Sequence, residues 1–323
     1  MFEFNIVFGP VPSRRLGRSL GINNITAKTC SYSCVYCQIG RTTDLTIDRK
    51  CFYRPEKVLE EVIRRIRTLS SRGEKIDYIT FVPDGEPTLD SNIGKEIVLV
   101  KRVGVPVAVI TNASLLWRKE VIEDLLDADY VSLKIDAVSE EVWKRVNRAH
   151  PSLKLDNILN GIREFSARFR GKIVTETMLI NGVDYGMELE KVSEYLKSLR
   201  RVDKAYISIP TRPPAEKWVK QPREKVINLA FQTFSKKVGL EKVELLVDYE
   251  GDNFTISDDI ERDFLSIMAV HPMRRDAVES LLTREGGGWH TIEKLLNEKK
   301  IVELEYEGKK YYMINLGHKT GAR

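Results

Sequence analysis

Three of the four cysteines lie close together, at Cys30, Cys34 and Cys37, in the spacing C-x3-C-x2-C. Thiolate is a soft ligand that selects zinc, copper(I) or iron–sulfur clusters. A structural zinc site takes four protein ligands and an ordinary 4Fe–4S cluster takes four cysteines. The fourth cysteine, Cys51, lies fourteen residues further on. A cubane held by this loop would therefore keep one iron open to another ligand, whereas zinc would need a ligand that the loop does not offer. A disulfide is disfavoured in a reducing compartment.

The stretch Thr29–Gln38 resembles the signature loop of the radical S-adenosylmethionine (SAM) enzymes, including the aromatic Tyr36 before the last cysteine. The resemblance implies a 4Fe–4S cluster on Cys30, Cys34 and Cys37, whose open iron holds the amino and carboxylate groups of SAM. One electron then cleaves SAM into methionine and a 5′-deoxyadenosyl radical, which takes a hydrogen atom from the substrate. Tyr36 is expected at the cofactor site.

Two further segments resemble SAM-binding segments of that superfamily. Asp84-Gly85-Glu86-Pro87 resembles its Gly-Gly-Glu-Pro segment, with Asp84 in place of the first glycine. Gly85 permits close backbone approach, and the resemblance implies that Gly85 and Glu86 bind the amino group of SAM. Taken alone, the segment would be an ordinary turn. Thr111-Asn112 resembles the Thr-Asn-Gly segment at the next strand end, although asparagine is common at turns.

Ser132, Lys134 and Asp136 alternate along a predicted strand and so share one face. In related enzymes, residues here reach the carboxylate and ribose of SAM; the alternative is a Lys134–Asp136 ion pair at the barrel rim. Glu176 is a candidate substrate or SAM contact if Val174 and Met178 face inward. Arg212 follows another strand, where its guanidinium could hold an anionic group of the substrate.

A narrower resemblance rests on Phe8–Arg18, Tyr36–Thr43 and Thr211–Pro214, and it covers about residues 8–215. It is to a subfamily that is similar to the tRNA wyosine-base synthases. Those enzymes carry a second cluster on extra cysteines, of which only Cys51 remains here, so the radical chemistry carries over and the wyosine reaction does not. We expect Cys51 to be an ordinary small buried residue.

Strand and helix patterns alternate through most of the chain. Strands are predicted at 19–25, 76–82, 105–110, 130–135, 172–180, 205–209 and 243–247, and helices at 56–69, 93–103, 118–126, 140–146, 156–169, 187–199 and 224–234. The Gly- and Pro-rich stretch 8–18 is predicted to be an ordered loop. This rhythm indicates a parallel sheet with right-handed crossovers. Six repeats after the first strand favour a partial (β/α)6-type barrel, which is open, over a closed eight-unit barrel.

The rhythm changes near Asp258. Helices are predicted at 258–269, 274–282 and 288–297, followed by a hairpin of 301–304 and 310–314 around Gly308. Three helices and a hairpin resemble a winged-helix domain, so two domains are expected, 1–252 and 253–323. We expect the second to select the substrate rather than to do chemistry. A winged helix suggests nucleic acid, yet residues 258–323 hold 11 Lys and Arg against 12 acids.

The 323 residues carry a net charge of +5. Residues 1–54 hold 8 Lys and Arg against 3 acids, so the excess surrounds the cysteine loop, where cations would stabilise an anionic cluster; a solvated basic surface is the alternative. With neither a signal peptide nor an apolar run of roughly eighteen residues, a cytoplasmic protein away from membranes is expected.

The expected function is a radical SAM enzyme supplied with electrons by a donor such as ferredoxin or flavodoxin. Its substrate is expected to be RNA, as in tRNA modification, or a protein. The alternatives are peptide modification, glycyl-radical activation, or a non-enzymatic, metal-dependent nucleic-acid-binding regulator. The SAM-binding segments at successive strand ends favour an enzyme, since a regulator has no need of them.

Overall fold

The computed structural model describes residues 5–26, 28–248, 251–256 and 259–315. Its main sheet has eight strands in the order β1-β2-β5-β6-β7-β8-β9-β10. Neighbours from β2 to β10 are parallel, and β1 is antiparallel to β2. The strands are β1 (Val7–Ser13), β2 (Gly17–Ile22), β5 (Tyr78–Phe81), β6 (Val107–Thr111), β7 (Tyr130–Lys134), β8 (Lys172–Met178), β9 (Lys204–Ser208) and β10 (Val243–Leu246).

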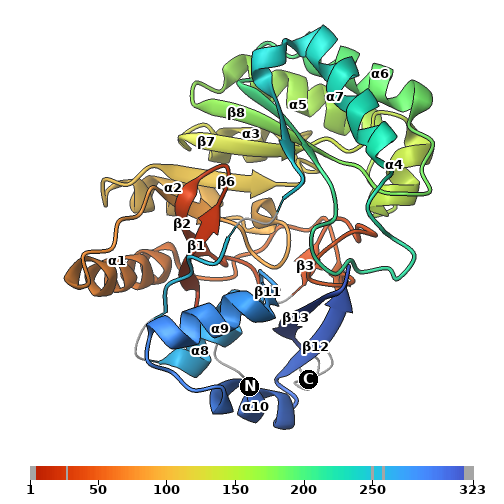
Figure 1. The fold of residues 1–323 in the computed structure, drawn as a ribbon. Helices are drawn as coiled ribbons and strands as arrows, with labels where there is room; N and C mark the ends of the chain where they lie inside the picture. Colours follow the sequence, from red (N-terminus) through yellow and green to blue (C-terminus); the bar gives the residue numbers. More distant parts are fainter. Residues whose placement is uncertain (1–4, 27, 249–250, 257–258, 316–323) are drawn as a thin grey trace.

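Helices connect the parallel strands and lie along one side of the curved sheet (Figure 1). They are α1 (Pro55–Ser71), α2 (Ile93–Lys101), α3 (Lys119–Leu125), α4 (Glu140–Asn147), α5 (Leu155–Arg168), α6 (Gly186–Ser198) and α7 (Glu224–Val238). Because β1 and β10 form the two edges of the sheet, the barrel stays open. The predicted α/β partial barrel is confirmed, with element bounds within a few residues of those expected.

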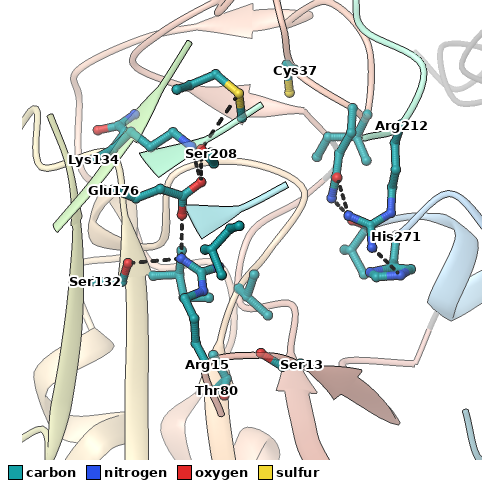
Figure 2. Close-up of a pocket in the computed structure, with 18 of the residues that line it drawn as sticks. Ser13, Arg15, Cys37, Thr80, Ser132, Lys134, Glu176, Ser208, Arg212 and His271 are labelled. Atoms are coloured by element: carbon teal, nitrogen blue, oxygen red, sulfur yellow. Dashed lines mark hydrogen bonds and ion pairs between the residues drawn. The ribbon is translucent and has the colours of Figure 1, made fainter. Parts of the chain in front are cut away.

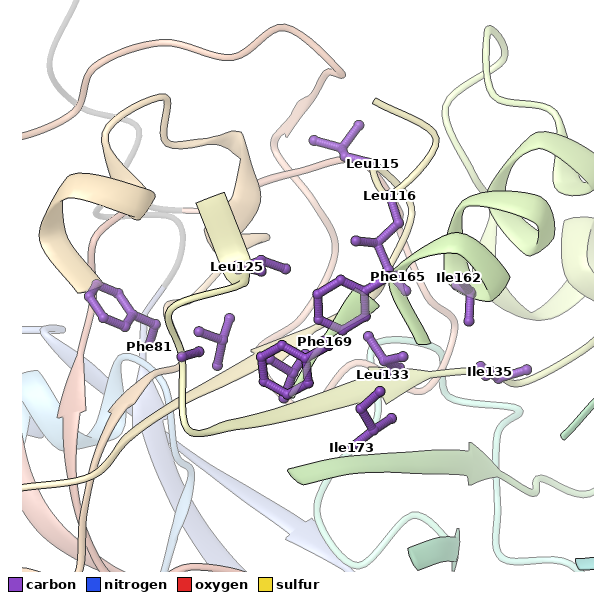
Figure 3. Close-up of a cluster of buried hydrophobic side chains, with 14 of the residues drawn as sticks. Phe81, Leu115, Leu116, Leu125, Leu133, Ile135, Ile162, Phe165, Phe169 and Ile173 are labelled. Carbon is purple, nitrogen blue, oxygen red and sulfur yellow. The ribbon is translucent and has the colours of Figure 1, made fainter. Parts of the chain in front are cut away.

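The main core fills the space between these helices and the sheet. Figure 3 shows Leu133 and Ile173 of the strands beneath Phe165 and Phe169, whose rings stack with centroids 4.8 Å apart. Alternate residues of each strand point the other way, so Val174 belongs to a separate cluster on the inner face. The inner face is therefore available for a cavity.

The prediction of a loop at residues 8–18 is wrong, because most of this stretch belongs to strands. Val7–Ser13 forms β1, with an irregularity in its pairing between Phe8 and Val11. Proline and glycine weaken central strands, but an edge strand tolerates them at a bulge. Gly9 and Pro10 lie at this irregularity on the sheet edge. Their presence therefore led to the prediction of a loop where the structure has a strand.

The C-terminal elements follow in the expected order, with one short strand that was not expected. They are α8 (Ile260–Met268), β11 (Met273–Arg274), α9 (Arg275–Arg284), α10 (His290–Asn297), β12 (Ile301–Tyr306) and β13 (Lys309–Ile314). The strands form one sheet in the order β11-β13-β12. Asp258, the expected start of the first helix, lies outside the described residues. The winged-helix class and the boundary after residue 252 remain predictions.

These elements share a core with the first strand. Phe8 and Val11 of β1 belong to the same buried cluster as Phe264 and Met273. Beneath them, the buried Arg65 of α1 pairs with Asp263 at 3.2 Å and donates to the carbonyl of Gly9 at 2.8 Å. The C-terminal elements therefore pack against the barrel through a shared core and buried polar contacts.

Candidate active site

A cavity of about 330 Å³ opens where the parallel strands end. The cysteine loop and the residues that follow β5, β6 and β9 line one part of the cavity. The connection between β1 and β2 lines another part. Val270 and His271 of the C-terminal elements complete the wall. In Figure 2, Arg15 reaches into the cavity from one end, while Cys37 and Arg212 lie at the other. The first two strands, the cysteine loop, the strand ends of the barrel and the C-terminal elements thus contribute to one site.

The three loop cysteines line this cavity, and each sulfur accepts a hydrogen bond from outside the loop's own sequence motif. Asn112 Nδ2 donates to Cys30 Sγ at 3.6 Å, and Asn147 Nδ2 donates to Cys34 Sγ at 3.5 Å. Cys37 Sγ accepts from the ammonium of Lys28 at 3.1 Å. These are the donors that stabilise thiolates.

Burial raises the pKa of Cys34 to about 12, and it also raises the pKa of Cys30. Metal binding requires deprotonated thiols and releases their protons. Across the described residues, no three Cys, His, Asp or Glu side chains surround a single point as the ligands of one metal ion do. The thiolates of a cubane instead bind separate irons. The three cysteines, with their donors and shared cavity, fit a 4Fe–4S cluster.

Cys51 lies elsewhere, and its expected burial is wrong. It is exposed, and its sulfur accepts from Asn92 Nδ2 at 2.9 Å. The segment that carries it returns from the cysteine loop along the surface to the start of α1. Small residues on such a connection need not be buried, whatever their hydrophobicity. Cys51 does not belong to the cavity lining.

Behind the loop, a buried hydrogen-bonded group holds its shape. The Tyr36 hydroxyl donates to Asp136, and Asn147 Nδ2 donates to the same carboxylate at 2.6 Å. Burial raises the pKa of Asp136, although Lys134 opposes this. Asp136 is not part of the cavity lining, whereas Tyr36 is. The structure thus places Asp136 behind Tyr36, where it supports the loop, and its contact with SAM stays a prediction.

Gly85 and Glu86 connect the cysteine loop to two strand ends. A Cβ on Gly85 would lie 2.0 Å from the carbonyl oxygen of Thr29, so only glycine fits. The buried carboxylate of Glu86 accepts from Thr111 Oγ1 at 2.6 Å and from the Asn112 amide at 2.7 Å. Asn112 in turn reaches the Cys30 sulfur. Glu86 therefore positions its neighbours, in addition to the acceptor role that we expect of it.

Charged side chains meet on the inner face of β7 and β8. Glu176 accepts from Lys134 Nζ at 2.8 Å and pairs with Arg15, which also donates to Ser132 Oγ at 3.3 Å (Figure 2). Burial raises the pKa of Glu176, but Lys134 and Arg15 outweigh it and hold that pKa well below its usual range. Burial lowers the pKa of Lys134, but Glu176 outweighs it and raises that pKa. Both groups are therefore charged at neutral pH.

Val174, Glu176 and Met178 face inward, which resolves the orientation that the sequence left open. Lys134 pairs with Glu176 across neighbouring strands rather than with Asp136 along its own strand. Its ammonium also lies 5.1 Å from the centre of the Tyr36 ring. The charged pair thus joins the strands to the loop that carries the cysteines.

Arg212 lies in the cavity wall, where the barrel meets the C-terminal elements. Arg212 Nη1 donates to Gln38 Oε1 at 2.9 Å, and Nη2 lies 3.0 Å from His271 Nε2. Because guanidinium has no acceptor, the imidazole accepts through Nε2. Gln38 Nε2 donates to the carbonyl of Val270 at 3.2 Å. The residue after the last cysteine is therefore joined to the C-terminal elements.

Sequence reasoning did not identify Arg15, Lys28, Asn147, Ser208 or His271 as site residues. Arg15 lies in the stretch 8–18 that carries the family resemblance, and Ser208 is the last residue of β9. Both positions could have identified these residues as candidates for the site. Lys28 and His271 lie on connections, where no periodicity reveals the direction of a side chain, and Asn147 is the last residue of α4. Only the packing of distant segments brings them to the site.

Similarity to a known protein family identifies the class of this protein. The model of the Radical SAM superfamily matches residues 24–196, so the chain belongs to that superfamily. Such enzymes use a 4Fe–4S cluster and SAM, and the cluster supplies the electron that cleaves SAM to a 5′-deoxyadenosyl radical. The predicted enzyme class is confirmed. The residue contacts to SAM remain predictions.

One relative in sequence and two solved structures are similar to this chain. A UPF0026 protein of Methanocaldococcus jannaschii is 46% identical over 96% of both chains. A radical SAM methyltransferase from Sphaerobacter thermophilus aligns with a TM-score of 0.51 over 72% of this chain and 66% of its own, at 16% identity. TYW1 with a lysine-pyruvate adduct bound aligns with a TM-score of 0.48 over 68% of this chain and 73% of its own, also at 16% identity. At this identity, the structural likeness concerns the fold alone.

Proposed function

We propose that this radical SAM enzyme modifies RNA, and that one nucleotide of the RNA enters the cavity from a basic rim beside it. The observation that carries the proposal is this rim, which consists of Arg41, Arg148, Lys217, Trp218 and Lys220, all exposed. Arginine and lysine contact phosphates, and an exposed aromatic ring stacks on a base. That combination suits single-stranded nucleic acid better than a neutral small molecule.

A buried carboxylate organises the rim. Glu216 accepts from Arg41 Nε at 2.9 Å and from Arg148 Nη1 at 2.6 Å. One carboxylate thus orients two guanidinium groups, which leaves a net positive charge before the two lysines are counted. The Glu216 amide donates to the carbonyl of Val35 at 3.0 Å. The rim is therefore fixed to the cysteine loop itself.

Along the chain, the rim adjoins residues that line the cavity. Arg41 follows Gln38 and Ile39 of the cavity lining after one glycine, and Trp218 lies on the same connection as Thr211 and Arg212 of the lining. A strand held by its phosphates on the rim would present a neighbouring nucleotide to the strand ends. Enzymes that act on a base commonly turn it out into a pocket of this kind.

The test measures 5′-deoxyadenosine formed by anaerobic, cluster-loaded protein with SAM and dithionite, with and without total cellular RNA. We expect RNA to stimulate product formation, RNase to remove the stimulation, and salt to weaken it steeply, because phosphate contacts release counterions. Lys217→Glu with Lys220→Glu, and Trp218→Ala, should each raise the RNA concentration needed several-fold. The matched control is Lys225→Glu, an exposed lysine on α7 outside the rim.

Stimulation that survives RNase and requires protein would instead support a protein or peptide substrate. Equal effects of the rim variants and of Lys225→Glu would also contradict the proposal. We further propose ferredoxin or flavodoxin as the electron donor and the cytoplasm as the compartment. Within the described residues, none of the helices has both the length and the apolar character needed to span a bilayer.

A further inference from the structure

Lys28 is a buried cation on the connection that precedes the cysteines. The residue is 2% exposed, although lysine is rarely fully buried unless it is paired. Its backbone has φ = 54°, in the left-handed region, and its carbonyl accepts from the amides of Thr43 and Asp44 at 3.3 and 3.2 Å. These hydrogen bonds join the start of the cysteine loop to the segment after it at Lys28.

The ammonium of Lys28 lies 3.1 Å from Cys37 Sγ. The donors to the other two sulfurs, Asn112 and Asn147, are neutral amides at longer distances, 3.6 and 3.5 Å. Cys37 therefore differs from Cys30 and Cys34 in having a charged donor. The difference is electrostatic, since all three sulfurs accept hydrogen bonds.

A buried ammonium is costly to desolvate unless a negative group lies beside it. A neutral thiol is a weak acceptor, whereas a thiolate carries the compensating charge. The positive charge of Lys28 is therefore compensated when Cys37 is a metal-bound thiolate. Its contact with the sulfur then brings a full positive charge next to the cluster that the loop fits.

We propose that Lys28 is a positioning residue that raises the reduction potential of the 4Fe–4S cluster. Reduction brings one electron from the external donor to the cluster and makes it one charge more negative. A fixed cation beside Cys37 stabilises the reduced state more than the oxidised state, because Coulomb attraction grows with that charge. Lys28 keeps its proton and supplies no electron. This inference depends on the cluster and is independent of the proposed RNA substrate.

The experiment is a redox titration of cluster-loaded protein followed by electron paramagnetic resonance of the reduced cluster. Lys28→Met removes the charge and the donor, Lys28→Gln removes the charge but keeps a donor, and Lys28→Arg keeps both. At the midpoint potential of the unmodified protein, the two neutral variants should show a ratio of reduced to oxidised cluster about tenfold lower, which is about 59 mV for one electron. Lys28→Arg should stay within about twofold.

Lys50→Met is the matched control. Lys50 belongs to the same basic segment, but its side chain is 55% exposed and its nearest carboxylate, Asp44, is 3.7 Å away. Solvent screens a charge there, so the ratio should move less than about twofold. A shift as large as that of Lys28→Met would show that net charge, rather than contact with Cys37, sets the potential, and would overturn the proposal.

Two other results would also overturn it. The first is an unchanged midpoint in Lys28→Met at full iron content. The second is a loss of iron in both neutral variants while Lys28→Arg retains it, because Lys28 would then serve assembly rather than the potential. Iron and sulfide content are measured on each variant before titration.

Discussion

Replacing Glu176 by glutamine tests whether the charged network inside the barrel is desolvated. Glu176 is 8% exposed and accepts from Lys134 Nζ at 2.8 Å and Ser208 Oγ at 2.9 Å, while it also pairs with Arg15. Glutamine keeps the shape and one acceptor oxygen, but it directs an amide N–H toward a cation. Two half-buried cations, Arg15 and Lys134, would then lose the carboxylate between them.

Removing one partner of a buried ion pair costs about 3–5 kcal/mol, because the other charge stays buried without compensation. Since about 1.4 kcal/mol is a factor of ten, the unfolding equilibrium should shift by more than about a hundredfold. The assay is anaerobic urea denaturation of the metal-free chain followed by circular dichroism. Glu140→Gln is the control, because the Glu140–Lys144 pair is 56% and 66% exposed and such a helix pair contributes about 0.3–0.5 kcal/mol.

A loss in Glu176→Gln no larger than in Glu140→Gln would refute the reasoning. It would mean that water already solvates Lys134 and Arg15 in the free protein. The carboxylate would then contribute to substrate or SAM binding without supporting the fold. The same two variants, titrated with SAM, separate those contributions.

Three further predictions follow from single contacts. Alanine at any of the three loop cysteines should abolish iron binding, whereas Cys51→Ala, at an exposed position outside the cavity, should leave about four irons per chain by elemental analysis. Gly85→Ala should prevent cluster loading, because its Cβ would collide with the Thr29 carbonyl at 2.0 Å; normal iron content would contradict this. Burial and the neighbouring Asp90 raise the pKa of Glu96 to about 9 from 4.5. Between those values the folded chain holds a proton that the unfolded chain has released, so the free energy of unfolding should fall as pH rises from about 4.5 to 9. Glu96→Gln should flatten that slope, as measured by denaturation at several pH values.

The sequence was most informative where chemistry lies at the ends of periodic elements. Gly85, Thr111 and Lys134 each end or follow a parallel strand, and parallel strands finish at one edge of a sheet. Their meeting around one cavity could therefore be expected from order alone. The three cysteines added a spacing that few other sites share.

The rest depended on contacts between distant segments. Asp136 continues the alternation of Ser132 and Lys134, but β7 ends at Lys134, so the pattern no longer decides its direction. His271 reaches the cavity because α8 packs on β1. No local pattern records that packing. The first strand was missed for the same reason, since its partner strand and covering helix, rather than its own composition, make it a strand.

The shared core of β1 and the C-terminal elements has a consequence for how the chain is made. β1 can pair with β2 as soon as both have left the ribosome, but Phe8 and Val11 lack their covering partners until α8 and β13 are synthesised. We therefore expect proteolysis of stalled nascent chains to cut near β1 until the last strand emerges; protection at shorter lengths would contradict this. The residues of β1 would then be buried only after the C-terminal elements that pack on them have left the ribosome, although β1 is translated long before those elements.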